Sequence, residues 1–168
     1  NTLINGMKDI SSPPGRMEYI CTVNQARIFV DFAHTPDALK NVLLASRSHT
    51  NNKLCIVFGC GGDRDKGKRS MMGKIANEYA DITYITDDNP RNEDPKIIRN
   101  DIILKCPNAI EEPDRKKAIM LAISNLKKGD LLLVLGKGHE DTQEINNRLL
   151  YFNDKNEILD FVQESNYE

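Results

Sequence analysis

Two short runs of the sequence are apolar at nearly every position, and they constrain the fold more than any other feature. Residues 54–59 (LCIVFG) and 131–135 (LLLVL) lack the alternation of apolar and polar side chains that marks a strand with one wet face. Continuous apolar strands of this length are covered on both faces, which is typical of parallel sheets. The sequence therefore predicts a mostly parallel sheet covered on both sides.

Segments with helical signals alternate with these strands. A capping residue followed by proline, the pattern of a helix start, occurs at residues 35–36 and 94–95, and the second helix should run to about Lys105. Caps are also expected at Asp114 and at Asp154, the latter with Glu157 three positions on. The residues expected to face inward are Ala38, Leu39, Val42, Leu43, Ser46, Met71, Met72, Ile75, Ala76, Tyr79, Ile119, Ala122, Ile123 and Leu126.

Further β-prone segments complete the pattern. Residues 18–23 and 26–32 are separated by Asn24-Gln25 and predict a hairpin, and residues 82–86 and 148–152 read as two more strands. Strands that alternate with helices are joined by crossovers, which place the helices on the sheet faces. We expect an α/β fold, a Rossmann-like three-layer sandwich with a mostly parallel sheet and helices on both faces.

The bulk properties indicate one soluble domain. The chain has 168 residues, a mass of 19.0 kDa and a formal net charge of −2, so no strong field favours nucleic acid or a membrane as a partner. No apolar run approaches the roughly 18 residues that cross a bilayer, and four cysteines without a CxxC pair suit a reducing cytoplasm. The histidines show no metal-ligand spacing. Residues 1–14 are expected to form a linker and residues 15–168 the domain.

Charge and glycine collect in four segments that each follow a predicted strand. These segments are residues 31–36, 59–69, 86–94 and 136–141. The carboxyl ends of parallel strands meet at one edge of a sheet, and ligands of such sheets bind there. The sequence therefore predicts a single binding site built from these four loops.

The densest of these segments is GDRDKGKR, residues 62–69. It fits the spacing of a phosphate-binding loop, but Arg69 stands where that loop needs serine or threonine to hold Mg²⁺. Asp63 and Asp65 would also repel a triphosphate held by backbone amides. A turn that grips a substrate carboxylate through Arg64 fits these residues better.

Two other loops carry candidate ligands for a small zwitterion. In DNPR, residues 88–91, Pro90 fixes the turn, Asn89 offers a donor and an acceptor, and the Arg91 guanidinium matches a carboxylate. Glu140 follows glycines with exposed carbonyls and could hold an ammonium group. Taken alone, Arg91 could be a solvated arginine in a capping loop, and GKGHE, residues 136–140, could be a plain charged loop. Together, the loops suit a zwitterion with more than one carboxylate.

Two rival readings stay open from the residues alone. The chain could be a free-standing module that binds an amino acid or a nucleotide without chemistry of its own. A nucleic-acid module built on the basic turn is disfavoured, because two aspartates interrupt the turn and aromatic residues are lacking nearby.

Five collinear motifs give the chain a family resemblance. They are GRME at 15–18, VDFAHTPDAL at 30–39, VFGCGGDRDKGKR at 57–69, TDDNPRNEDP at 86–95 and GKGHED at 136–141. In this order and spacing they resemble the C-terminal domain of the Mur ligases, and the resemblance covers nearly the whole chain. It is closest to the branch that adds the third residue of the peptidoglycan stem.

The resemblance implies an ATP-dependent amide ligase. In that branch, ATP phosphorylates the carboxylate of UDP-N-acetylmuramoyl-L-Ala-D-Glu, and the amine of an amino acid attacks the acyl phosphate. The DNPR motif resembles the version associated with meso-diaminopimelate. By resemblance, Arg16, Asp31 and His34 would contact ATP. The residues expected to bind meso-diaminopimelate are Arg64, Asp88, Asn89, Pro90, Arg91, Gly136 and Glu140.

Other parts of such a ligase are not found in this sequence. It shows no Walker A motif and no UDP-binding domain, and Mg²⁺ would be held mainly by the central domain of the family. The chain also begins at Asn1 rather than methionine. We therefore expect it to be the C-terminal domain of a three-domain ligase, and to be inactive alone because the phosphoryl-transfer machinery lies elsewhere.

Overall fold

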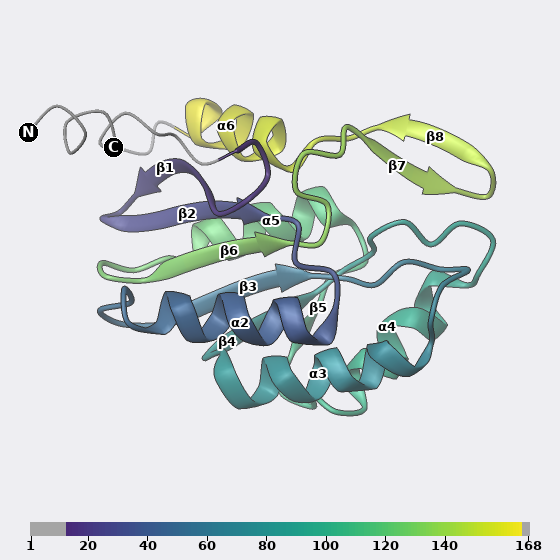
Figure 1. Ribbon diagram of the computed structural model, residues 1–168. Coiled ribbons are helices and arrows are strands. Elements are labelled where there is room, and N and C mark those ends of the chain that lie inside the picture. The colour runs from purple at the N-terminus through teal and green to yellow at the C-terminus, as the bar shows by residue number, and fades with distance from the viewer. Residues whose placement is uncertain (1–12, 166–168) are drawn as a thin grey trace, which may run out of the picture.

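A mostly parallel sheet forms the middle layer of the domain (Figure 1). The computed structural model describes residues 13–165, so most of the expected linker at residues 1–14 lies outside the described part. Within residues 13–165, the sheet has six strands, in the spatial order β1 (Glu18–Val23), β2 (Ala26–Asp31), β6 (Leu131–Leu135), β3 (Leu54–Phe58), β4 (Ile82–Ile85) and β5 (Ile110–Glu111). Only β1 runs antiparallel to its neighbour among these strands, which confirms the predicted sheet type.

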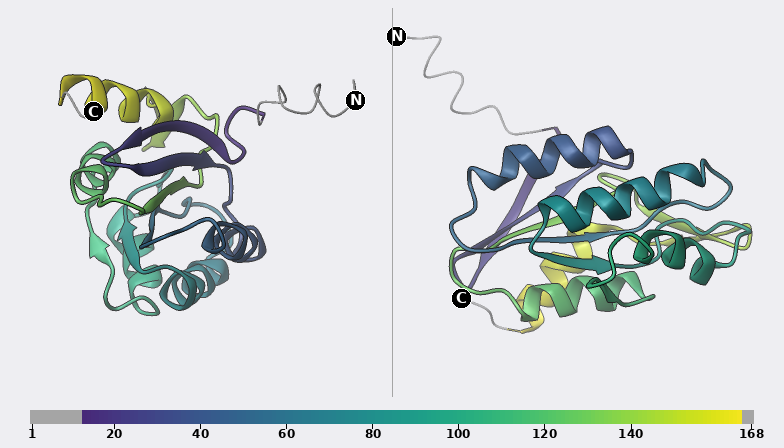
Figure 2. Two further views of the ribbon diagram at one scale, coloured as in Figure 1. Left: turned by 90° about the vertical axis from the view of Figure 1, so that its left-hand side faces the viewer. Right: turned by 90° about the horizontal axis from the view of Figure 1, so that it is seen from below.

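Helices cover both faces of this sheet. The first face is packed by α2 (Pro36–Arg47), α3 (Gly67–Tyr79) and α4 (Pro95–Ile103), and the second by α5 (Arg115–Ser124) and α6 (Asp154–Glu164). Seen from below, α2 and α3 lie on one side of the strands and α5 and α6 on the other (Figure 2). The expected three-layer sandwich is therefore confirmed.

Strand β3 shows why the continuous apolar runs predicted this layering. Its side chains alternate between the two cores: Leu54, Ile56 and Phe58 pack toward α2 and α3, and Cys55 and Val57 pack toward α5. All five are buried. No position along the strand meets water, so no position is polar.

The helix starts follow the capping signals, with one correction. The Thr35 hydroxyl accepts a hydrogen bond from Ala38 N, and the expected caps Asp94 and Asp114 also bond to first-turn amides. At α6, the prediction that Asp154 is the cap is wrong. Asn153 caps this helix, because Asp154 is fully buried and its carboxylate binds Arg115 instead.

The expected hairpin is confirmed, whereas one helix face differs from the expectation. Asn24 and Gln25 both have positive φ, at 50° and 60°, as a two-residue hairpin turn requires. In α3 the residues that face the core are Arg69, Met72, Gly73 and Ala76. Met71, expected to face inward, is 56 % exposed, so that expectation is wrong.

Two strands were not expected from the sequence. They are β5 and β7 (Thr142–Ile145). Strand β7 pairs antiparallel with β8 (Arg148–Tyr151) in a separate two-stranded ribbon. The ribbon projects beside the carboxyl ends of the central strands (Figure 1). It therefore stands next to the edge at which the sequence predicts a site.

Candidate functional site

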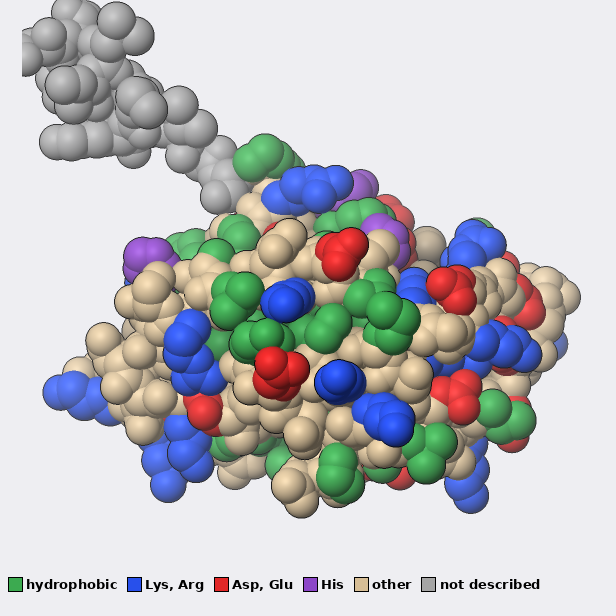
Figure 3. All heavy atoms as spheres, turned by 60° about the horizontal axis from the view of Figure 1, so that its bottom comes forward, with side chains coloured by type: hydrophobic (Ala, Val, Ile, Leu, Met, Phe, Trp, Pro, Cys, Tyr) green, Lys and Arg blue, Asp and Glu red, His purple; other side chains and the backbone are tan. Residues whose placement is uncertain are grey.

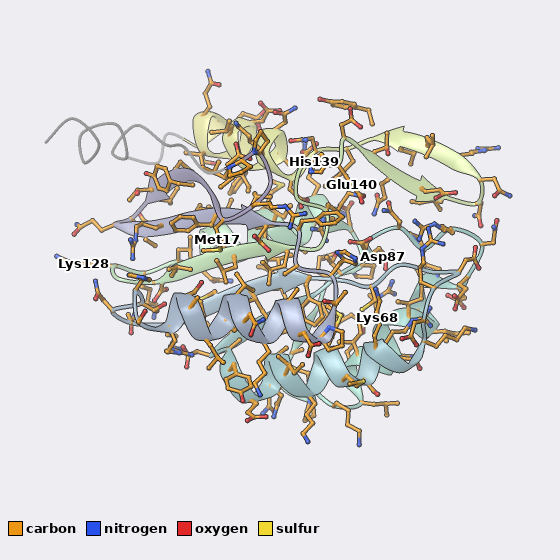
Figure 4. All side chains as sticks on the ribbon, in the orientation of Figure 1. Met17, Lys68, Asp87, Lys128, His139 and Glu140 are labelled. Atoms are coloured by element: carbon orange, nitrogen blue, oxygen red, sulfur yellow. The ribbon has the colours of Figure 1, made fainter. Side chains whose placement is uncertain are left out.

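The four charged loops surround one cavity at the carboxyl ends of β2, β3, β4 and β6. The cavity has a volume of about 590 Å³. Among the residues expected from the sequence, those that line it are His34, Arg64, Asp88, Asn89, Arg91, Gly136 and Glu140. Figure 4 shows Lys68 of α3 and Glu140 of the loop after β6 at this end of the sheet. The parallel topology therefore brings together residues that are more than 100 positions apart.

A network of hydrogen bonds joins two of these loops at the floor of the cavity. Asn89 Nδ2 donates to Glu140 Oε2 at 2.9 Å. Lys137 Nζ donates to Asn89 Oδ1 and to Glu140 Oε2, each at 3.0 Å. Lys137 is fully buried, whereas the Glu140 side chain is 35 % exposed toward the cavity. The loop after β4 and the loop after β6 are thus held in one geometry.

Arg91 is anchored by its backbone as much as by its side chain. Its φ of 52° lies in the left-handed region, which costs a non-glycine residue on the order of 1 kcal/mol. Two backbone hydrogen bonds to the ribbon hold it there: Arg91 N donates to Glu144 O at 3.0 Å, and Asn146 N donates to Arg91 O at 2.7 Å. The ribbon therefore fixes the place from which the guanidinium reaches the cavity.

The Arg91 guanidinium already has partners on two sides. Its Nε pairs with Glu144 Oε2 at 2.9 Å, and its Nη1 donates to Gly62 O at 2.9 Å. Within residues 13–165, Nη2 donates no hydrogen bond. A carboxylate can therefore approach the Nη end of the guanidinium, while Glu144 occupies the Nε side.

The remaining residues expected to bind the amino acid take different places. Arg64 is exposed at the cavity wall, where its Nη1 forms a long hydrogen bond to Asp63 O at 3.4 Å. Gly136 has a φ of 111°, and a Cβ there would lie 2.9 Å from Asp88 Oδ2, so glycine permits the close approach of these loops. Pro90 is buried behind the cavity and is not part of its lining.

The residues expected to contact ATP lie along one rim of the cavity. The Arg16 guanidinium lies 5.5 Å from the centre of the Phe32 ring, which also packs against the rings of His34 and His139. Asp31 is engaged within the fold, because its carboxylate accepts hydrogen bonds from the backbone amides of Met17 and Ala33, both at 2.8 Å. Arg16 and Asp31 are next to the cavity lining rather than part of it.

Arg69 takes no part in the cavity. Its buried guanidinium pairs with Glu93 at 2.9 Å and with Asp101 at 3.1 Å, linking the first turn of α3 to α4 and to the loop before α4. The hydrogen bond from Arg69 lowers the pKa of Glu93 to about 2. The residue that breaks the phosphate-loop pattern is thus a structural cation, which agrees with the sequence argument against such a loop.

Sequence reasoning missed several residues of the site. Lys137 and Glu144 bind the expected residues directly, and Phe32, Lys68 and Met71 line the cavity. Cys60 also lines it, but burial raises the pKa of this thiol to about 12, so it is no nucleophile near neutral pH. For Lys137, the only signal in the sequence was its position between two glycines, Gly136 and Gly138. That signal was weak, because a lysine in a glycine-rich loop is expected to be exposed unless the loop is known to fold inward.

Comparisons with known proteins agree with the motifs. Residues 15–138 match the family model described as "Mur ligase, glutamate ligase domain". A "UDP-N-acetylmuramoyl-L-alanyl-D-glutamate--2,6-diaminopimelate ligase" from Mesorhizobium japonicum is 47% identical over 159 residues, which cover 94% of this chain and 33% of that protein. The ligase of the same name from Rickettsia bellii is 50% identical over 156 residues, covering 90% and 32%. The chain spans about one third of the length of these relatives.

Solved structures show the same relation. A structure of a ligase of that name superposes with a TM-score of 0.87 at 38% identity, covering 99% of this chain and 35% of the other. A bifunctional folylpolyglutamate synthase/dihydrofolate synthase from Yersinia pestis, at 21% identity, covers 76% and 29% with a TM-score of 0.62 and shares the fold alone. With a family model over most of its length and relatives near half identity, the chain belongs to the Mur ligase family.

Proposed function

We propose that this chain is the amino-acid-binding domain of an ATP-dependent ligase that adds meso-diaminopimelate to UDP-N-acetylmuramoyl-L-Ala-D-Glu. The names of its relatives support this substrate, and the cavity supports it independently. We also propose that the ligase works in the cytoplasm. Within the described residues, no helix has the length and apolar character needed to span a bilayer.

One observation carries the proposal: a cation, Arg91, and an anion, Glu140, line the same cavity, and both bond to Asn89. Asn89 binds Glu140 directly, and Arg91 is two residues along the same loop. An amino-acid end carries an ammonium and a carboxylate on the same carbon, so its recognition needs this pairing of opposite charges. The distal ammonium of meso-diaminopimelate would meet Glu140 and the distal carboxylate would meet Arg91.

This placement explains how the domain would choose its substrate. L-lysine carries the distal ammonium but no distal carboxylate, so its binding would leave the Arg91 guanidinium without an external partner. Losing the charge-assisted hydrogen bonds between this guanidinium and the distal carboxylate costs roughly 2–5 kcal/mol, which is enough for strong discrimination. Arg64, which is exposed at the cavity wall, would meet the carboxylate next to the reacting amine.

The domain would supply positioning rather than bond chemistry. ATP activates the dipeptide carboxylate, and this chain would hold the amine where it can attack. Arg16 and His34 would contact the phosphates of ATP and Asp31 its ribose. No group of three or more His, Cys, Asp or Glu side chains within residues 13–165 is arranged to hold a metal ion, and we assign Mg²⁺ mainly to the central domain of the ligase.

The test is the substrate preference of the ligase that carries this domain. With UDP-N-acetylmuramoyl-L-Ala-D-Glu and ATP, phosphate release should require meso-diaminopimelate and be far slower with L-lysine, and the 168-residue chain alone should release none. Equal rates with both amino acids would contradict the proposed substrate. If the ligase bound meso-diaminopimelate but consumed no ATP with any dipeptide, the rival reading of a binding module without catalysis would hold.

A further inference from the structure

Lys137 is a fully buried charged group that contacts two residues of the cavity lining. Its exposed fraction is zero, and its ammonium bonds to Asn89 Oδ1 and Glu140 Oε2. A buried ammonium is costly unless it is paired and hydrogen-bonded, so these two partners offset the burial of Lys137. Replacing it would therefore act first on Asn89 and Glu140.

The three side chains form a closed set of hydrogen bonds. Glu140 Oε2 accepts from both Lys137 and Asn89, and Asn89 Oδ1 accepts from Lys137 and from Glu144 N at 3.0 Å. The Asn89 side-chain amide therefore has a single orientation in which Nδ2 donates to Glu140 and Oδ1 accepts from Lys137 and Glu144 N. Within residues 13–165, no hydrogen bond to Glu140 Oε1 is formed. One carboxylate oxygen is fixed and the other is left for a ligand.

We propose that Lys137 is a positioning residue that holds Glu140 so that its second oxygen meets the distal ammonium of the substrate. The proposal rests on the function proposed above, and it adds a residue that does not line the cavity. Without Lys137, the Glu140 carboxylate would lose one of its two fixed bonds and could rotate away from the ammonium. Arg91 has no hydrogen bond to Lys137, so the contact between Arg91 and the distal carboxylate should persist when Lys137 is replaced.

The test compares three amino acids in the ligase that carries this domain. L-lysine lacks the distal carboxylate, and L-2-aminopimelate keeps it but lacks the distal ammonium. The kcat/KM ratio of meso-diaminopimelate to L-2-aminopimelate therefore measures ammonium recognition, and the ratio of meso-diaminopimelate to L-lysine measures carboxylate recognition.

In Lys137→Met, the first ratio should fall on the order of 10- to 100-fold, because a hydrogen bond to a charged group is removed or misdirected. The second ratio should stay within about twofold, since the two contacts are separate. In a Glu140→Gln background, Lys137→Met should lower the first ratio no further. A merely structural role would instead lower kcat/KM for all three amino acids alike, and that result would overturn the proposal.

Lys116→Met is the matched control. It makes the same substitution and removes a similar lysine–glutamate pair, Lys116 Nζ to Glu157 Oε2 at 2.9 Å, which lies outside the cavity lining. Both ratios should keep their wild-type values in this variant. A fall of the first ratio in Lys116→Met as large as in Lys137→Met would also overturn the proposal.

The wild-type enzyme separates this inference from the proposed function. If wild type does not prefer meso-diaminopimelate over L-2-aminopimelate, the ammonium site itself is wrong. If wild type prefers it and Lys137→Met keeps the full preference, only the role of Lys137 is wrong.

If Lys137→Met fails to fold, nuclear magnetic resonance of wild type with ¹⁵N-labelled lysine decides. The proposal expects a lysine ammonium signal that is protected from exchange and shifts with meso-diaminopimelate and L-lysine, but much less with L-2-aminopimelate. Equal shifts with all three, or no protected signal, would refute it.

Discussion

Replacing Arg91 by methionine should remove the proposed preference of the ligase for meso-diaminopimelate. The backbone bonds of Arg91 to Glu144 and Asn146 do not involve its side chain, so the variant should keep the loop in place. What it loses is a guanidinium that is 19 % exposed, with Nη2 open to a carboxylate, together with the pair to Glu144 and the hydrogen bond to Gly62 O. The experiment therefore removes the guanidinium while the backbone anchor of the loop is kept.

The magnitude follows from the partial burial of this side chain. Removing a charge-assisted hydrogen bond from a partly enclosed site costs about 2–4 kcal/mol, which corresponds to roughly 30- to 1000-fold in kcat/KM. The loss should fall on meso-diaminopimelate. L-lysine has no distal carboxylate, so its kcat/KM should change far less.

The assay is steady-state phosphate release by the full-length ligase, with each amino acid and ATP varied in turn. KM for ATP should be unchanged. Arg148→Met is the matched control, because Arg148 lies on β8 of the same ribbon but outside the cavity lining, and it should behave as wild type. Equal losses for meso-diaminopimelate and L-lysine, or an equal effect on ATP, would refute the assigned role of Arg91.

Three further predictions test other parts of the structure. Asp154→Ala leaves the buried Arg115 without its carboxylate and should lower the free energy of unfolding in urea by about 3–5 kcal/mol, and most of the loss should return when Arg115→Met is added. Glu93 has a folded pKa lowered from 4.5 to about 2 by Arg69, so its contribution to stability should be fully present above pH 4.5 and be lost as the pH falls toward 2; Glu93→Gln should flatten the urea stability profile over that range. His34→Ala should raise KM for ATP in the full-length ligase and leave KM for meso-diaminopimelate near its wild-type value.

Each of these has a clear contrary outcome. An Asp154→Ala variant as stable as wild type would mean that Arg115 finds another partner or water. If the free energy of unfolding of Glu93→Gln fell with decreasing pH as steeply as in wild type, the loss of stability in acid would belong to other carboxylates. Unchanged ATP kinetics in His34→Ala would remove that residue from the nucleotide site.

The fold was predictable because its signals are local. A strand such as β3 is apolar at every position since both of its faces are covered, and the pairs Thr35-Pro36 and Asp94-Pro95 mark helix starts by their own chemistry. The loops that carry charge could be assigned to one edge because parallel strands all end there. Each of these inferences needs only neighbouring residues and the rule of the layer architecture.

The features that sequence reasoning missed depend on interactions between distant residues. Asn153 and Asp154 can both cap a helix, and Arg115, 39 positions away, decides between them by binding Asp154. The charge of Lys137 suggests an exposed side chain until the loop after β6 is folded against Asn89. Strand β7 has the polar sequence TQEI and half-buried positions, so its role as the partner of Arg91 leaves little trace in the sequence.

One face of the molecule agrees with the sequence argument against a nucleic-acid module. On the face that carries α2 and α3, basic and acidic side chains are interspersed with apolar ones (Figure 3). That distribution differs from the continuous basic stripe by which proteins track a nucleic-acid backbone.

The attachment of the β7–β8 ribbon to Arg91 has a consequence for how selectivity can change. Since the main chain of the ribbon sets where the guanidinium stands, an insertion or deletion near Asn146-Asn147 would shift that cation while every residue in the pocket stayed the same. Amino-acid choice could thus be retuned from outside the pocket, by altering the length of a hairpin. Relatives with an identical DNPR motif but a different ribbon are where such a change in substrate should be sought.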